Sequence, residues 1–356
     1  MNGPKRAGKR PWGEQIREHD MQKIWLGAVA AIALMAGQAV TATQSAAEGP
    51  AVVFDLGGKF DKSFNEAAYN GAERFKSESG NAYREFEVQN ASQREQALRN
   101  FARRGHNPVV AIGFAQAQAL EKVAKEFPDT KFAIIDMVVD LPNVRSVVFK
   151  EHEGSFLVGM LAAMASKTGK VGFVGGMDIP LIRKFACGYV QGAKAVNPDI
   201  EIYQNMTGTT GAAWNDPVKG GELAKSQFDR GADVVYHAAG GTGLGVLQAA
   251  ADAGKLGIGV DSNQNYLHPG SILTSMLKRV DNAVFNAFTD GTSGNWSAGI
   301  QALGLQEEGV GYALDDNNAK LISDDMKSEV DDARQKIIAG EIAVHDYMSD
   351  NSCPAS

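Results

Sequence analysis

The feature of this chain that most constrains its fold is a repeated alternation of short apolar runs with longer amphipathic stretches. In the first part of the chain the apolar runs predict strands over 50–56, 83–88, 108–114, 131–137 and 144–149. The stretches between them predict helices over 63–77, 93–104 and 117–127. Strands that alternate with helices of ~10–15 residues are typical of parallel sheets built from βαβ units.

The same alternation restarts near residue 154. It predicts helices over 154–167, 182–197, 216–230 and 243–253, and strands over 170–175, 200–206, 233–238 and 257–261. Two runs of this kind predict an α/β protein with two doubly wound lobes. From residue 271 the pattern is mixed, so we expect the chain to cross back between the lobes before an acidic, solvent-exposed helix over 323–339.

Residues 1–47 have the pattern of a secretory signal peptide. Lys23 precedes an apolar run over 24–36, and small residues predict cleavage after Ala47. The run is shorter than the ~20 residues of a membrane span, although a retained anchor helix is the alternative. Translation could also begin at Met21, which would make residues 1–20 an over-long start. Because neither cysteine lies near the end of the run, we expect an exported protein that is soluble in the periplasm and carries no lipid anchor.

Composition and charge exclude several classes of protein. With 356 residues, 44% of them hydrophobic, the chain is long enough for two cores, and its net charge of −7 argues against a general nucleic-acid-binding surface. The histidines show no metal-binding spacing, and neither a nucleophile elbow nor a Walker loop is present, so we expect no metal and no cofactor. Cys187 and Cys353 could pair in an oxidising compartment, or Cys187 could be a buried thiol and Cys353 a free one; the sequence leaves both open.

Three aspartates lie at the ends of three different predicted strands: Asp55, Asp136 and Asp261. In doubly wound sheets ligands bind at the carboxyl ends of the strands, so these side chains are candidates for a binding site. The alternative for each is a helix cap or a salt bridge at a hinge.

The stretch from Asp55 to Asn65, DLGGKFDKSFN, joins a strand end to a helix start through a glycine turn. Ser63 is the expected N-cap, and backbone N–H groups at such a helix start can point at a ligand. Phe64 offers a flat face, and Asn65 offers both a donor and an acceptor. The alternative is ordinary loop and cap chemistry with Phe64 in the core.

A second glycine turn, GGTGLG over 240–245, follows the predicted strand 233–238. With Asp261 at the end of the next strand, it imitates a dinucleotide-binding motif, but its last glycine is misplaced for G-x-G-x-x-G. A turn that lets the backbone approach a small ligand explains the same residues, and an NAD site is the weaker alternative.

Taken together, the leader, the first glycine motif and several later stretches resemble the basic membrane protein (BMP) family of substrate-binding proteins, which serve ABC importers. The later stretches are FVGGMDIP (173–180), FACGYVQG (185–192), DPVKG (216–220), GADVV (231–235) and GVD (259–261). The resemblance implies a type I periplasmic-binding-protein fold with two Rossmann-like lobes joined by a hinge. Residues 48–152 and about 279–305 would form the N-terminal lobe, and residues 153–278 and about 306–356 the C-terminal lobe.

The resemblance also implies a set of ligand-binding residues from both lobes: Asp55, Phe64, Asn65, Asp136, Phe185, Gly241, Asp261 and Lys278. Asp55 and Asn65 would hydrogen-bond the edge of a base, and the two phenylalanines would flank its faces. The other two aspartates would accept from ribose hydroxyls. Lys278 would offset the repulsion among the carboxylates, and Gly241 would give backbone room.

Well-understood members of the family bind purine nucleosides, which implies a receptor, not an enzyme, for adenosine, guanosine or inosine. It would be a monomer that hands its ligand to an ABC permease in the inner membrane. The alternatives are a receptor for a nucleobase, a sugar or another small polar solute, an exported nucleoside-processing enzyme, and a sensor. The run GVDSNQ over 259–264 departs from the usual family pattern, and Trp214 either alters the pocket size or packs at the hinge.

Overall fold

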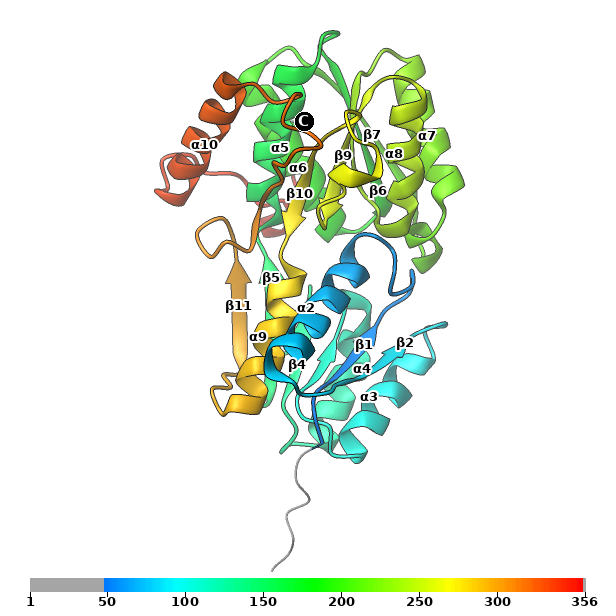
Figure 1. Cartoon of the computed structure of the whole chain (residues 1–356), viewed down its shortest axis with the longest axis vertical. Coiled ribbons are helices and arrows are strands. Elements are labelled where there is room, and N and C mark those ends of the chain that lie inside the picture. Colours follow the sequence, from blue (N-terminus) through cyan, green and yellow to red (C-terminus); the bar gives the residue numbers. More distant parts are fainter. Residues whose placement is uncertain (1–47, 355–356) are drawn as a thin grey trace, which may run out of the picture. The chain divides into compact units, whose positions relative to one another are not determined.

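The computed structural model describes residues 48–354, which form two six-stranded sheets with helices on both faces (Figure 1). The first sheet has the order β11-β5-β4-β3-β1-β2, and all its strands are parallel. Its strands are β1 (Ala51–Phe54), β2 (Arg84–Glu87), β3 (Val109–Ala111), β4 (Phe132–Ile135), β5 (Val144–Phe149) and β11 (Gly299–Leu303). We call this sheet and its helices the N-terminal lobe.

The second sheet has the order β12-β10-β9-β8-β6-β7, and only β12 runs antiparallel to its neighbour in the sheet. Its strands are β6 (Lys170–Met177), β7 (Glu201–Gly208), β8 (Val234–Ala238), β9 (Leu256–Asp261), β10 (Ile272–Lys278) and β12 (Val310–Tyr312). We call this sheet and its helices the C-terminal lobe. In both sheets the winding reverses beside the first strand, β1 or β6, and that is where doubly wound sheets bind ligands.

Side chains that alternate along each strand bury against helices on opposite faces of the sheet. In β1, Val52 and Phe54 pack with α2 (Phe64–Ser79) and α9 (Val280–Ser293), whereas Ala51 and Val53 pack with α3 (Gln93–Arg103) and α4 (Ala117–Glu126). The C-terminal lobe repeats this arrangement. Its helices are α5 (Glu151–Ala165), α6 (Pro180–Val196), α7 (Pro217–Asp229), α8 (Gly243–Asp252) and α10 (Asp324–Ile338).

Within the described residues the chain passes from one sheet to the other three times: between β5 and α5, between β10 and α9, and between β11 and β12. These crossings place the ends of β5 and β10 at the junction of the lobes (Figure 1). The predicted α/β fold with two doubly wound lobes is confirmed. The region after residue 271 is more regular than expected, because it contains β10 and α9, and α5 begins at Glu151 and not at residue 154.

The predicted signal peptide lies outside the described residues, and the exact lobe boundaries stay predictions. Among residues 48–354, no helix combines the length and the apolar character that a membrane crossing needs. Of the two alternatives for the cysteines, the structure has the disulfide: Cys187 in α6 is bonded to Cys353. The C-terminal segment therefore lies against the C-terminal lobe.

Candidate ligand-binding cleft

A cleft of about 630 Å³, including its opening to solvent, lies between the two lobes. Strand ends, the start of α2 and the first turns of α6 surround it. The N-terminal lobe contributes Asp55, Leu56, Asp61, Phe64, Asn65, Gly113, Phe114 and Asp136. The C-terminal lobe contributes Leu181, Ile182, Phe185, Trp214, residues 238–240, Val260, Asp261 and Lys278. A space of this size is typical of sites for small organic ligands.

Seven of the eight residues implied by the family resemblance line this cleft, and Gly241 does not. Its neighbour Gly240, with φ 56°, supplies the wall there, while Gly241 lies against the backbone of Trp214. Gly241 thus lies one residue behind the wall, and whether it gives backbone room to the ligand stays a prediction. The roles of the other seven residues stay predictions, although the fold brings them together.

Lys278 is the last residue of β10 and lies at the centre of the buried charges. Its Nζ is 2.7 Å from Asp136 Oδ2 and 3.0 Å from Glu151 Oε1. Three ring centroids lie 5.1–5.4 Å from the same nitrogen, those of Phe149, Phe64 and Phe185. Burial alone would lower the pKa of Lys278, but the surrounding carboxylates outweigh burial and raise that pKa. Lys278 is therefore a fixed positive charge.

Asp136 and Asp261 share an unusual backbone, with φ values of 71° and 62°. Such left-handed conformations are strained for residues other than glycine, and they cluster at functional sites. Burial raises the pKa of each carboxyl to about 6, although Lys278 opposes that rise. Asp136 Oδ1 is buried with no hydrogen-bond partner among the described residues. Asp261 Oδ2 accepts the hydroxyl of Ser63 at 2.5 Å.

The start of α2 is not open to a ligand, contrary to the expectation from its sequence. The carboxylate of Asp61 accepts the backbone N–H groups of Ser63, Asn65 and Glu66 at 2.8, 3.0 and 3.1 Å. The Ser63 side chain makes no capping bond, because its hydroxyl donates to Asp261. Burial raises the pKa of Asp61 to about 6 despite these hydrogen bonds, which lower it. Asp61 therefore caps α2, which is the role that the sequence predicts for Ser63.

Asp55 and Asn65 are tied to each other and to the protein. Asn65 Oδ1 accepts the backbone N–H of Asp55 at 3.2 Å, and Asn65 Nδ2 donates to Asp61 at 3.2 Å. Asp55 Oδ1 accepts from Arg94 Nη2 at 2.8 Å and from Arg94 Nε at 2.9 Å. The other oxygen, Oδ2, faces Gly113, where an added Cβ would lie 3.3 Å from it. Asp55 Oδ2 and one hydrogen of the Asn65 amide therefore remain for a ligand.

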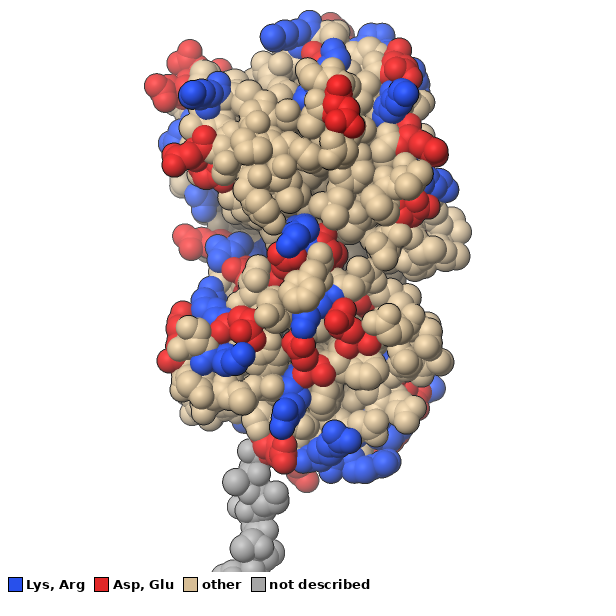
Figure 2. All heavy atoms as spheres, turned by 45° about the vertical axis from the view of Figure 1, so that its right-hand side comes forward, with Lys and Arg blue, Asp and Glu red and all other residues tan. Residues whose placement is uncertain are grey.

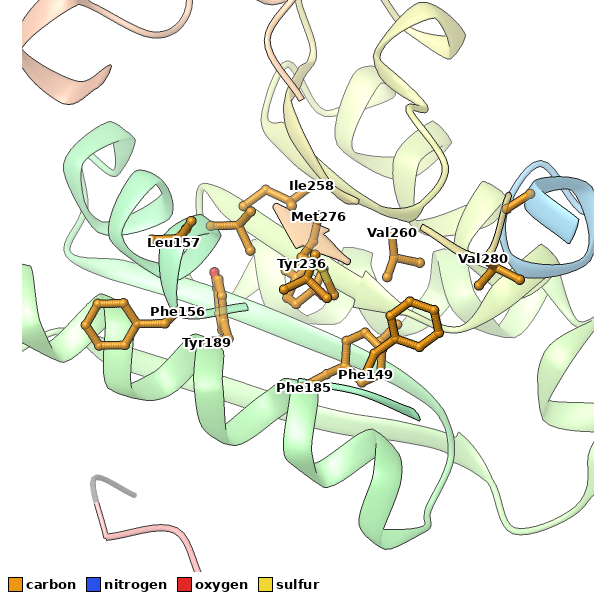
Figure 3. Packing of buried hydrophobic residues seen from close by; sticks show 14 of the residues in the cluster. Phe149, Phe156, Leu157, Phe185, Tyr189, Tyr236, Ile258, Val260, Met276 and Val280 are labelled. Carbon is orange, nitrogen blue, oxygen red and sulfur yellow. The ribbon is translucent and has the colours of Figure 1, made fainter. Parts of the chain in front are cut away.

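Aromatic side chains from both lobes form much of the wall. Phe64 begins α2, and Phe185 comes from α6, with 3% of its surface exposed. Figure 3 shows Phe185 and Phe149 side by side. Trp214 also lines the cleft, and its ring lies so close to Gly176 that an added Cβ there would come within 2.3 Å of it. Trp214 therefore both lines the cleft and packs against β6, so its two predicted roles, on pocket size and in packing at the hinge, stay predictions.

Sequence reasoning missed Asp61 and Glu151. Asp61 lies within the DLGGKFDKSFN stretch, where an acidic residue two positions before an N-cap was a usable signal. Glu151 begins α5 with 1% of its surface exposed, and its Oε2 is 3.0 Å from Lys184 Nζ. Figure 2 shows charged side chains of both signs gathered on the surface around the junction of the lobes.

The glycine turn over 240–245 serves packing. An added Cβ at Gly243 would lie 1.9 Å from the His237 ring, and one at Gly245 would lie 1.7 Å from the carbonyl oxygen of Pro217. These glycines therefore allow α8 to lie close to α7 and β8, which explains the motif without a dinucleotide. In residues 48–354, no group of three or more His, Cys, Asp or Glu side chains could hold a metal ion.

Comparison with known proteins places this arrangement in a family. The family described as "ABC transporter substrate-binding protein PnrA-like" matches residues 50–347. An ABC transporter nucleoside-binding protein of Lactococcus lactis is 33% identical over 317 residues, which cover 83% of this chain and 88% of that protein. A solved structure of an ABC transporter solute-binding protein from Aeropyrum pernix is 33% identical, with a TM-score of 0.76, and covers 83% of this chain and 92% of that one.

A further relative corrects the expected location. A protein of Pyrococcus horikoshii, 37% identical over 278 residues covering 74% of this chain and 68% of the relative, is named a lipoprotein, as is a Pyrococcus furiosus protein. The prediction of a soluble periplasmic protein without a lipid anchor is therefore wrong. It depended on the absence of a cysteine near the end of the apolar run.

Proposed function

This chain belongs to the PnrA-like family of ABC transporter substrate-binding proteins, and we propose that it captures a purine nucleoside between its lobes and delivers it to an ABC permease. Proteins of this family bind solutes for transport and are not enzymes. The coarse function, capture of a small solute for an ABC transporter, follows from membership. The choice of a purine nucleoside, and of a monomer as the active form, is the proposal.

The observation that carries this proposal is the pairing of buried acceptors with aromatic walls in one cleft. Asp136 Oδ1 is a buried acceptor without a partner among the described residues, beside the fixed charge of Lys278. An unpaired buried acceptor is unfavourable, so a ligand hydroxyl that donates to it is stabilised by roughly 1.5–3 kcal/mol. A ribose offers hydroxyl donors, and Asp261 lies at the same cleft to accept another.

The aromatic side chains account for the base. Phe64 from one lobe and Phe185 or Trp214 from the other supply flat apolar surfaces, and stacking on such a surface contributes roughly 1–3 kcal/mol per base. Asp55 and Asn65 could then hydrogen-bond the base edge with the atoms that Arg94 and Asp61 leave available. A free sugar would donate to the buried acceptors but would not stack on the aromatic side chains. A free base would stack on the aromatic side chains but would leave the acceptors of ribose hydroxyls unpaired.

The charge of the cleft argues against nucleotides. Four carboxyl groups line it, those of Asp55, Asp61, Asp136 and Asp261, against a single lysine. A ligand phosphate would meet repulsion from these groups, which disfavours phosphorylated ligands. The Lactococcus lactis relative, whose name records nucleoside binding, gives independent support.

Calorimetric titration tests the proposal. After any co-purified ligand is removed, inosine, adenosine and guanosine are titrated in turn, with ribose, hypoxanthine and inosine monophosphate as comparators. We expect at least one nucleoside to bind ~100-fold more tightly than ribose or base alone, because stacking and hydroxyl contacts add within one ligand. Tightest binding of a sugar or a base would favour the alternative receptor, and no heat with any nucleoside would overturn the proposal. Light scattering on the same samples tests whether the protein is a monomer.

A further inference from the structure

A chain of ion pairs leads from the cleft to the C-terminal segment. Lys278 Nζ is 3.0 Å from Glu151 Oε1, and Glu151 Oε2 is 3.0 Å from Lys184 Nζ. Lys184 Nζ is in turn 3.4 Å from Asp346 Oδ2. From Asp136 in the cleft to Asp346, which follows α10, the charges in this series of ion pairs alternate in sign.

The inner members of this chain are removed from water. The side chains of Glu151 and Lys184 are 1% and 8% exposed, so each charge depends on its partners. Burial would raise the pKa of Glu151, but the two lysines lower it; burial would lower the pKa of Lys184, but Glu151 and Asp346 raise it. His152 and Glu153 are further titratable groups at this end, and His152 Nδ1 is 4.0 Å from Asp346 Oδ2.

The C-terminal segment, residues 341–354, is held on α6 by contacts that fix Asp346. Gln191 exchanges two hydrogen bonds with the backbone of His345, at 3.0 and 2.8 Å. Four residues along, on the same helix, Cys187 forms the disulfide with Cys353. Helix α6 also carries Phe185 of the cleft wall, so one helix holds both the segment and the wall.

We propose that Asp346, Lys184 and Glu151 are positioning residues for Lys278, so that one residue of the C-terminal segment acts on the binding cleft. Glu151 is shared by two lysines, and Asp346 supplies Lys184 with a second carboxylate. Without the Asp346 charge, Glu151 is drawn toward Lys184, and Lys278 then depends more on Asp136. Asp136 would in that case be less available to a ligand hydroxyl, so the affinity falls although no residue of the cleft has changed.

The test compares two aspartates of the same segment. Asp346→Asn removes a charge that belongs to the series of ion pairs. Asp350→Asn removes a charge outside that series, which pairs with His345 and accepts hydrogen bonds from Ser352. We expect Asp346→Asn to weaken inosine binding about threefold, since the pair that it breaks is part-exposed, and Asp350→Asn to leave it unchanged. The double variant Cys187→Ala/Cys353→Ser removes the covalent link but keeps the hydrogen bonds of Gln191 and the Asp346 charge, so it should weaken binding less than Asp346→Asn.

A second measurement is independent of any ligand. The NMR signals of the Lys278 side chain, in protein made with isotope-labelled lysine, should shift in Asp346→Asn and not in Asp350→Asn. This inference depends on the proposed function for its ligand, and the two fail differently. Absence of nucleoside binding in the wild type overturns the proposed function, while the lysine signals still test the positioning. Unchanged inosine affinity in Asp346→Asn, unchanged Lys278 signals, or an equal loss in Asp350→Asn overturns the positioning role.

Discussion

Lys278 and Ser63 both join one lobe to the other, but through different chemistry. Lys278 makes buried ion pairs with Asp136 of the N-terminal lobe and with Glu151, which follows the first crossing between the lobes. At Ser63 the contact is a set of hydrogen bonds to the end of β9 and to the loop that follows it. Ser63 donates to Asp261, Ser262 donates to the Ser63 carbonyl at 2.9 Å, and Gln264 donates to the Lys62 carbonyl at 3.0 Å.

The difference separates a permanent contact from one that can open. Removing one partner of a buried ion pair costs about 3–5 kcal/mol. An ordinary hydrogen bond contributes about 0.5–1.5 kcal/mol, and one to a carboxylate about 1.5–3 kcal/mol, and water can replace either when the lobes separate. Lys278 also lies on a crossing segment, where lobe motion displaces residues least. We therefore infer that the ionic contact persists when the lobes separate, and that the Ser63 contact breaks.

The largest expected effect comes from Lys278→Met. It leaves Asp136, Glu151 and Asp261 buried around an uncharged side chain, so the free energy of unfolding should fall by about 3–5 kcal/mol, with nucleoside binding lost. Urea unfolding measures the first effect and calorimetry the second. Lys327→Met on the exposed face of α10 is the matched control and should change neither. A Lys278→Met protein as stable as the wild type would contradict the central role of this lysine.

The next effect is a pH dependence that both contacts share, since Asp136 and Asp261 have a pKa of about 6. Their folded pKa lies above the ordinary value near 4, so the folded chain binds more protons than the unfolded chain between about pH 4 and 6. Their contribution to the free energy of unfolding therefore falls as the pH rises through that window. Nucleoside affinity changes in the opposite direction.

Ionised carboxylates accept ligand hydroxyls, so inosine affinity should decline below about pH 6, approaching tenfold per pH unit for each carboxylate that must ionise. Titrations from pH 5 to 7 check the decline. Asp261→Asn should flatten part of it, and Asp350→Asn should not. An affinity independent of pH over this range would show that neither aspartate binds the ligand as an anion.

The third effect concerns the aromatic wall beside the two contacts. Phe64→Ala should weaken nucleoside binding at least tenfold, because a tenfold change is about 1.4 kcal/mol and stacking contributes that or more. Phe60, in the same loop with 59% of its surface exposed, provides the control Phe60→Ala, for which no change in affinity is expected. Equal affinity of the Phe64→Ala variant would assign that ring to the core.

The two contacts also differ in what the sequence could predict. Asp55, Asp136 and Asp261 follow strands with a clear apolar pattern, so their place at the cleft followed from the fold class. Lys278 was found through the family resemblance alone, because β10 and α9 lie in the region where the apolar pattern is mixed.

Glu151, Lys184 and Asp346 could not have been found in this way. They are far apart in the sequence, and no local period or motif records that three charges will meet inside the protein. At the start of α2, a tertiary contact overrides the local preference for a serine N-cap. Ser63 is a good N-cap by type, but its hydroxyl gains a bond to Asp261 of the other lobe, and Asp61 takes over the capping.

The smallest expected effect tests whether the Ser63 contact opens. Ser63→Ala removes the donor to Asp261 and leaves the Asp61 cap in place, so the free energy of unfolding should fall by no more than about 1.5–3 kcal/mol, as expected for a hydrogen bond to a carboxylate. Because that bond favours the closed arrangement, the ligand-free variant should spend more time open, which raises its radius of gyration in X-ray scattering and weakens inosine binding a few-fold. Ser92→Ala, on an exposed turn of the N-terminal lobe, is the control. If Ser63→Ala and the wild type scatter identically without ligand while saturating inosine compacts both, the lobes open without this bond as a latch, and closure depends on the ligand and the ionic contact alone.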